Sequence, residues 1–212
     1  MAAADTGTRE RLIGAAQEEL IQGHGHFEMQ AVAKRAQLSV GLAYHHFGSK
    51  AGLIAAVVER FYGLLDDAAF NGAHLVSEYW ADREKKRISA YVAFHYQHPF
   101  APFVIGALSR APEVLDVETA FTNRQLAAGA RMLQAAQRDG VIAADIDPHL
   151  TIALMIGGIR QALIGALTSE QRPDPEKLTN AIWAFMAGAL RLTEPADKSA
   201  KDRLTLDKRK PI

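Results

Sequence analysis

Residues 28–50, EMQAVAKRAQLSVGLAYHHFGSK, place two short amphipathic segments on either side of a tight turn. Apolar residues recur at the spacing of one helix face in the first segment, at Met29, Val32, Ala33 and Ala36. A similar period continues in the second segment, at Gly41, Tyr44 and Phe47. Ser39 is a suitable N-cap for the second helix, because its hydroxyl can accept from a free backbone N–H. This stretch therefore predicts a helix-turn-helix, with Leu38 folded into the seam between its helices.

The second helix of such a unit is the one that enters the major groove of DNA. Its first residues would approach the base edges, and they are Ser39, Val40, Gly41 and Leu42. Gly41 lets the backbone come close, whereas Val40 and Leu42 can only pack on thymine methyl groups.

The stretch resembles the DNA-binding domain of the TetR family of bacterial transcriptional repressors. The resemblance runs from about Thr8 to Phe61 and rests on the run VAKRAQLS, on YHHF and on Ser49-Lys50 before an apolar helix. It implies that Tyr44, His46 and Lys50 contact phosphates and that His45 lies near the base edges.

The chain departs from the family pattern at three places. Gln37 stands where glycine is usual, and a residue able to adopt a positive φ is expected there. Phe27 and Glu28 stand where the family usually has threonine. Leu42-Ala43 replaces Thr-Leu in the recognition helix, which favours apolar reading of bases.

The charge balance does not show the basic footprint that is usual for a DNA-binding protein. The 212 residues carry 24 basic and 24 acidic side chains, and residues 1–50 are also balanced. We therefore expect few phosphate contacts per subunit and a modest salt dependence. Arg35, Lys50 and four histidines are expected to cluster near the reading helix.

Helical periods and the absence of a useful run of period 2 predict an all-α fold. We expect a three-helix DNA-binding head over residues 1–50, an effector-binding and dimerisation body over 51–195, and a disordered charged tail over 196–212. The expected helices span residues 8–22, 29–36, 40–47, 50–70, 83–97, 103–109, 113–139, 148–168 and 175–192, with Thr8 as the first N-cap and a break at residues 71–74. The charge run at residues 83–87 is expected to form a solvated face.

The helices at residues 152–167 and 181–190 are apolar on nearly all sides and must be buried on more than one side. Small residues form stripes that permit close helix contact, and a two-fold four-helix seam would bury them. The predicted dimer interface consists of Ile152, Ile156, Gly158, Ala162, Gly165, Ala181, Ala184, Phe185 and Gly188. A purely intrachain core is the alternative.

Aromatic residues with isolated polar groups in the middle helices indicate a small-molecule site. Its candidate residues are Tyr91, Phe94, His95, Phe103, Phe121, Arg124, Met155 and Ile159. Packing in a plain core is the alternative for most of them. His24 with His26, and His95 with His98, have spacings that could hold a metal, but no nearby Cys or carboxylate completes either set. We expect no metal and no cofactor.

These features together predict a cytoplasmic, homodimeric repressor that binds a palindromic operator and is released by a small-molecule effector. The chain has no cysteine, no signal peptide at its first residues and no uninterrupted apolar run near the length of a membrane span, so no membrane association is expected. No catalytic motif is present, which argues against an enzyme. An all-α interaction protein that does not bind DNA, and a small all-α enzyme, are the rival hypotheses.

Overall fold

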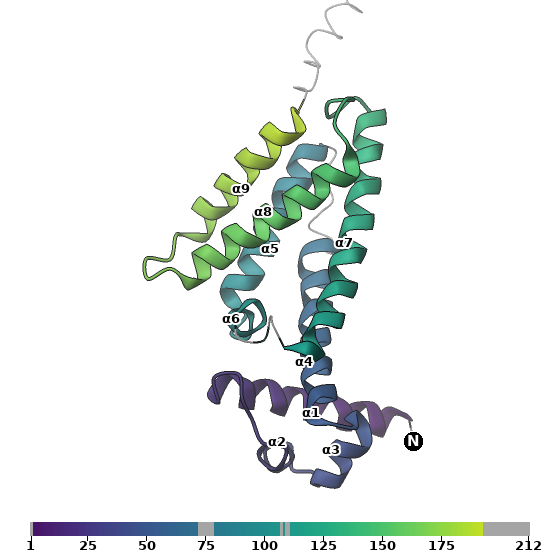
Figure 1. Ribbon diagram of the computed structural model, residues 1–212, viewed down its shortest axis with the longest axis vertical. Coiled ribbons are helices and arrows are strands. Elements are labelled where there is room, and N and C mark those ends of the chain that lie inside the picture. Colours follow the sequence, from purple (N-terminus) through teal and green to yellow (C-terminus); the bar gives the residue numbers. More distant parts are fainter. Residues whose placement is uncertain (1, 72–78, 107, 109–110, 193–212) are drawn as a thin grey trace, which may run out of the picture.

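The computed structural model describes residues 2–71, 79–106, 108 and 111–192. This part of the chain is helical and contains no strand, which confirms the all-α fold. The elements are α1 (Ala2–Gln22), α2 (Met29–Arg35), α3 (Val40–Phe47), α4 (Lys50–Leu65), the π-helix η1 (Asp66–Phe70), α5 (Trp80–Gln97), α6 (Ala101–Ile105), α7 (Pro112–Arg138), α8 (Pro148–Thr168) and α9 (Pro175–Leu190). Figure 1 shows α1–α3 as a head at one end of the molecule, joined by α4 to the bundle of the remaining helices.

The first helix is longer than predicted. It begins at Ala2, so Thr8 lies inside α1 and is not its N-cap. Alanines favour helix, and Asp5 in the first turn complements the helix dipole. The helix stops at the expected place, because His24 and Gly25 adopt positive φ values of 52° and 94°.

The turn between α2 and α3 has the predicted chemistry. Gln37 adopts a φ of 54°, and the Leu38 N–H donates to the Ala33 carbonyl at 2.9 Å, which closes α2. Leu38 is half-buried against the head core. The Ser39 hydroxyl accepts from the Leu42 N–H at 3.2 Å, and the Ser49 hydroxyl caps α4 in the same way, accepting from Gly52.

The helices of the body follow the predicted order with shifted ends. Asp147 and Asp174 cap α8 and α9, each followed by proline at the first helical position. α5 begins at Trp80 instead of residue 83. α6 occupies Ala101–Ile105 instead of residues 103–109, because its capping turn starts directly after Pro99.

The charge run that opens α5 is not wholly solvated. Lys85 and Lys86 are exposed, but Glu84 is only 2% exposed and pairs with Arg87. Its burial raises the pKa of the Glu84 carboxyl. The predicted break at residues 72–74 and the tail at 196–212 lie outside the described residues.

Two hydrophobic clusters hold the structure together. One cluster runs without interruption from α1–α3 through α4 and α6 to the start of α7, and Phe61 and Phe100 are fully buried in it. The other joins α5, α7, α8 and α9. The head therefore shares its core with the lower body, and α4 is the element common to both.

Candidate nucleic-acid interface

Helix α3 presents one face to solvent at the end of the molecule farthest from the body (Figure 1). Ser39, Gly41, Tyr44 and His45 are exposed on it, with Tyr44 at 47%. Ala43 is buried on the opposite side, which anchors the helix to the head core. The structure thus brings four of the predicted DNA-facing residues together on one accessible surface.

Val40 and Leu42 are half-buried and flank this exposed face. Val40 also packs against the head core, so only part of its side chain is available to a base. The Ser39 hydroxyl accepts from the Leu42 amide, so its role within the chain is to cap α3.

His46 is placed differently from the other predicted contacts. Its side chain is 8% exposed, and Nε2 lies 3.5 Å from the Asp5 carboxylate of α1. The ring also packs near Phe47, at 6.1 Å between centroids. A phosphate contact would require the ring to leave this position, so we omit His46 from the proposed interface.

Lys50 lies in the first turn of α4, beside the end of α3. Its ammonium is 3.9 Å from the Glu28 carboxylate and 5.0 Å from the centroid of the Phe27 ring. The Lys50 side chain is 41% exposed and that of Glu28 is 88% exposed. The cation therefore remains accessible, with a solvated acidic neighbour that stands where the family usually has threonine.

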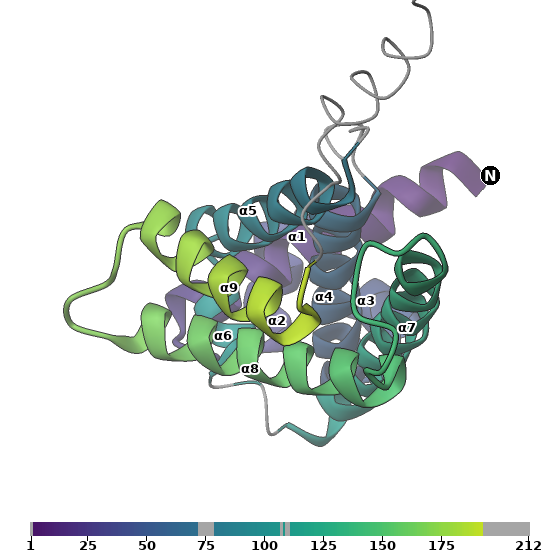
Figure 2. The same ribbon diagram turned by 90° about the horizontal axis from the view of Figure 1, so that it is seen from above.

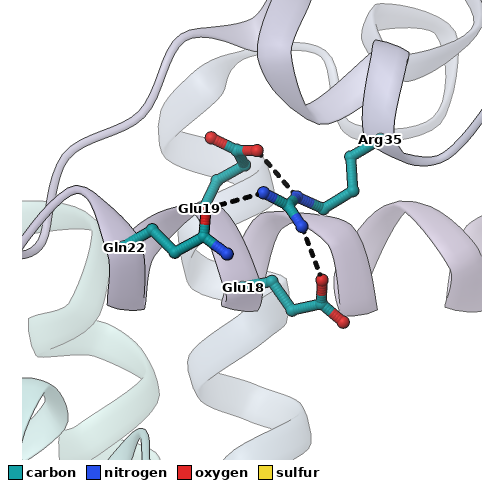
Figure 3. Close-up of polar contacts among 4 residues, drawn as sticks. All are labelled: Glu18, Glu19, Gln22 and Arg35. Atoms are coloured by element: carbon teal, nitrogen blue, oxygen red, sulfur yellow. Dashed lines mark hydrogen bonds and ion pairs between the residues drawn. The ribbon is translucent and has the colours of Figure 1, made fainter.

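Arg35 is not available for DNA in this arrangement (Figure 3). Its guanidinium donates to Glu19 at 2.7 Å, to Glu18 at 2.9 Å and to Gln22 at 2.8 Å, all on α1. The hydrogen bond to Glu19 is the main cause of the raised pKa of Arg35. The expectation that Arg35 joins a basic cluster at the reading helix is wrong: the residue ties α2 to α1.

Other arginines of the head are also engaged. Arg11 donates to the Ala36 carbonyl at 2.5 Å, and Arg60 lies 3.7 Å from Glu10. The electrostatic attraction of the head for DNA therefore depends on few cations, with Lys50 prominent among them. The sequence contains these residues but does not reveal their pairings, because the fold brings together residues that lie 13 or more positions apart.

The predicted effector residues other than Arg124 lie in the interior of the body. Phe94 and His95 pack against Phe61, and Tyr91 packs against His95. Met155 and Ile159 belong to the second hydrophobic cluster, against which Tyr91 also packs. Phe103 stacks on Phe100, and Phe121 stacks on Tyr62 at 4.3 Å between ring centroids. Arg124 is on the surface, 60% exposed and 3.6 Å from Asp66.

Two of the hollows on the described surface include none of those eight residues. One lies between α5 and α9 and is lined by Lys85, Lys86, Ser89, Thr179 and neighbouring residues. The other, of about 280 Å³, lies along α7 and is lined by Leu115, Glu118, Thr119, Thr122 and Asn123.

His95 is the most strongly perturbed titratable group among the predicted residues. It is 3% exposed, and Nδ1 donates to the Tyr91 carbonyl at 2.9 Å. Burial lowers the pKa of His95 to about 4 and raises that of Tyr91 to about 12. Both groups are therefore neutral near pH 7, and no group of three or more potential metal ligands occurs in the part of the chain that the structure describes.

The predicted dimer residues fall into two sets. The small residues and Phe185 are exposed along adjacent faces of α8 and α9, which lie side by side in Figures 1 and 2. Leu150 and Leu154, 61% and 64% exposed, extend the α8 face. Ile152 is only 7% exposed and packs in the core of its own chain, and Ile156 is half-buried, so neither contributes much to this surface.

Helix α8 is the one described helix that is long and apolar enough to cross a membrane by length and composition. The expectation based on uninterrupted runs overlooked it, because Arg160 and a few polar residues interrupt an otherwise apolar helix. Only 28% of its most apolar window is buried within the chain.

A family model for bacterial regulatory proteins of the tetR family matches residues 12–57, which contain α2, α3, the second half of α1 and the first half of α4. In its head, the chain is therefore similar to this family. No curated protein sequence matches it. The resemblance that the motif of residues 28–50 implied is confirmed.

Solved structures share the fold over most of the chain. FadR from Bacillus subtilis, determined in complex with stearoyl-CoA, is 17% identical with a TM-score of 0.72 and covers 85% of this chain and 98% of its own. GusR from Salmonella enterica is 22% identical with a TM-score of 0.69, covering 87% and 96%. A protein from Mesorhizobium loti that is assigned to the TetR family is 18% identical with a TM-score of 0.68, covering 88% and 96%. The chain thus shares the fold of these proteins, with a helix-turn-helix head and a helical body.

Proposed function

We propose that this protein is a TetR-type transcription regulator: a cytoplasmic homodimeric repressor that binds a palindromic operator and is released by a small-molecule effector. The observation that carries the proposal is the exposed face of α3, where Gly41, Tyr44 and His45 are accessible at the tip of the head. DNA contact is proposed for Ser39, Val40, Gly41, Leu42, Tyr44, His45 and Lys50. The proposed domain boundary is the start of α4, with residues 51–195 as the effector and dimerisation domain.

The DNA-binding part is tested with genomic fragments selected by the full-length chain and then used in gel shifts. Tyr44→Ala and Lys50→Ala should weaken binding, because each removes a contact from the exposed tip. Loss of Lys50 should also reduce the salt slope by about one per subunit. Tyr79→Ala and Lys177→Ala are matched controls, since both residues are exposed and lie on the body. Equal affinity of all four variants at low salt would contradict the assignment.

The dimer part rests on the exposed small stripes of α8 and α9. A Cβ added at Gly165 or Gly188 meets no atom within 4 Å in the chain, so a larger side chain there would project into the proposed partner. At Gly158 the added atom would lie 3.5 Å from the Phe185 ring of the same chain, which makes that position a poorer test. Two-fold symmetry places the proposed α8–α9 surface against its copy and gives two heads for two half-sites.

Gly165→Leu with Gly188→Leu should shift the protein toward monomer in sedimentation experiments. Overpacking costs about 1–3 kcal/mol per site, and symmetry doubles the number of sites. Gly63→Leu is the control, because Gly63 is exposed on α4 and its added Cβ also meets nothing within 4 Å. A double variant that dimerises like the wild type would place the interface on other helices.

Release by an effector would follow from stronger binding of the ligand to the conformation whose heads are spaced wrongly for DNA. The FadR complex with stearoyl-CoA shows that a protein of this fold can hold a small molecule. In this chain the aromatic interior around Tyr91, Phe94 and His95 supplies apolar surface with isolated polar groups.

A further inference from the structure

A partly exposed polar cluster joins residues of α4, α7 and α8 in the body. Arg160 of α8 forms an ion pair with Glu118 of α7, and the side chains are 35% and 14% exposed. The Tyr62 hydroxyl of α4 is within hydrogen-bonding reach of Arg160. Residues of three helices thus meet at one guanidinium.

This guanidinium is partly exposed and borders an apolar region of the body. Tyr62 is 7% exposed and stacks on Phe121 of α7. Tyr91 and His95 of α5 are close enough for Arg160 to influence their ionisation. Burial keeps His95 neutral near pH 7, so Arg160 is the cation of this group of residues.

Glu118 could move away from Arg160 into an adjacent hollow. It lines the solvent-open hollow of about 280 Å³ along α7, together with Thr119, Thr122 and Asn123. Rotation toward that hollow would hydrate the Glu118 carboxylate and leave the guanidinium without its carboxylate partner. A planar guanidinium can then bind another carboxylate in bidentate fashion.

We propose that Arg160 recognises the carboxylate of an organic anion with an apolar tail, which replaces Glu118 at the guanidinium. This inference rests on the proposed function, in that it gives the effector its chemical class. Tyr62 then connects the site to the head, because it lies on the helix that carries Lys50 at its other end. Tyr91 and Phe121 would contact the apolar part of the ligand beside its carboxylate.

The charge of the ligand is tested with matched series of equal size. Octanoate and phenylacetate are each compared with the corresponding amide and with octylammonium or phenethylammonium, using the full-length chain without DNA. The carboxylates should raise the melting temperature more than the amides do, and the ammonium compounds should have the smallest effect. A larger effect of the ammonium compounds, or equal effects of all three charges, would overturn the proposal.

Two substitutions then separate recognition from simple helix pairing. Arg160→Gln should raise the half-saturating concentration of the carboxylate at least tenfold. Glu118→Gln should lower this concentration severalfold, because it removes the competing carboxylate. If the site instead bound a cation, Arg160→Gln would tighten ligand binding and Glu118→Gln would weaken it. An Arg160→Gln variant that responds like the wild type would also refute the assignment.

Arg160→Lys covers the case in which the glutamine variant does not fold. It keeps the charge but loses the fork geometry, so its response should be intermediate, and a wild-type response would count against bidentate recognition. Operator binding is measured on the same samples. If the wild type binds its operator but no carboxylate stabilises it, this inference fails and the proposed function stands. If the carboxylate binds through Arg160 and no operator is bound, the proposed function fails and the site stands.

Discussion

Glu28 should lower the affinity of the head for DNA, and removal of its charge should raise that affinity. Its carboxylate lies 3.9 Å from the Lys50 ammonium, the cation proposed to contact a phosphate. In a complex, Glu28 would compete with that phosphate for Lys50 and would also repel the phosphate. The Glu28→Gln variant removes both effects and keeps the size of the side chain.

The magnitude follows from the exposure of the pair. With side chains 41% and 88% exposed, solvent screens the interaction, so each pair contributes about 0.2–1 kcal/mol. A dimer with two heads would gain about 0.4–2 kcal/mol, which corresponds to about 2- to 30-fold tighter binding. The gain should be larger at low salt, because exposed charges are screened as ionic strength rises.

The assay is titration of labelled operator at several salt concentrations. Glu59→Gln is the matched control, since it removes one exposed carboxylate from the same region and changes the net charge equally. The double variant Glu28→Gln/Lys50→Ala isolates the coupling between the two residues. The reasoning is refuted if Glu28→Gln binds no more tightly than Glu59→Gln, or if its full gain persists without Lys50.

Three further predictions concern reading, packing and pH. Exchange of thymine for uracil in a half-site should weaken binding if Val40 and Leu42 pack on thymine methyl groups, and a half-site indifferent to every such exchange would place both residues elsewhere. Gly129→Ala should lower the free energy of unfolding by about 1–3 kcal/mol, because the added Cβ would lie 2.4 Å from Ile152 Cγ1, and an additional Ile152→Val should recover part of the loss in denaturant titrations. The pKa of His95 is about 4 in the folded chain and about 6.5 in the unfolded chain, so the unfolded state binds the proton first as the pH falls. The free energy of unfolding should therefore fall by up to about 3 kcal/mol between pH 6.5 and pH 4. His95→Gln should flatten that part of the curve of stability against pH.

Local chemistry made the helix-turn-helix predictable. Ser39 and Ser49 cap α3 and α4 as expected, and Gln37 adopts the positive φ that the turn requires. Such features depend on residues within four positions of one another, which a sequence displays directly. The start of α1 was missed for a related reason: Thr8 has the chemistry of a cap, but residues 2–7 can continue the helix and do so.

The site in the body could not be read in the same way. Apolar and aromatic residues at helical spacing have the same pattern whether they line a cavity or fill a core, so the sequence could not show that Met155 and Phe103 pack in the two hydrophobic clusters. The pairings of Arg35 and Arg160 join residues 13 to 42 positions apart, and no local pattern specifies them. Residue type gave the number of charges, and only the fold shows which of them are free to meet a ligand.

Helix α4 provides a physical route from the proposed anion site to DNA. Tyr62 and Lys50 are separated by twelve residues of one helix, or about 18 Å at 1.5 Å per residue. A rotation of about 5° at the Tyr62 end would therefore move Lys50 by about 1.6 Å, enough to break a contact with a phosphate. Coupling of this kind is reciprocal, so bound operator must weaken carboxylate binding by the same factor by which the carboxylate weakens operator binding. Octanoate titrations with and without operator should give this common coupling factor. In the Arg160→Gln variant the coupling factor should be one, so that octanoate no longer changes the affinity for operator. A factor that keeps growing with the carboxylate concentration, instead of reaching a limit, would mean that the carboxylate displaces DNA by direct competition at the head. An unchanged factor in Arg160→Gln would mean that it acts at a second site.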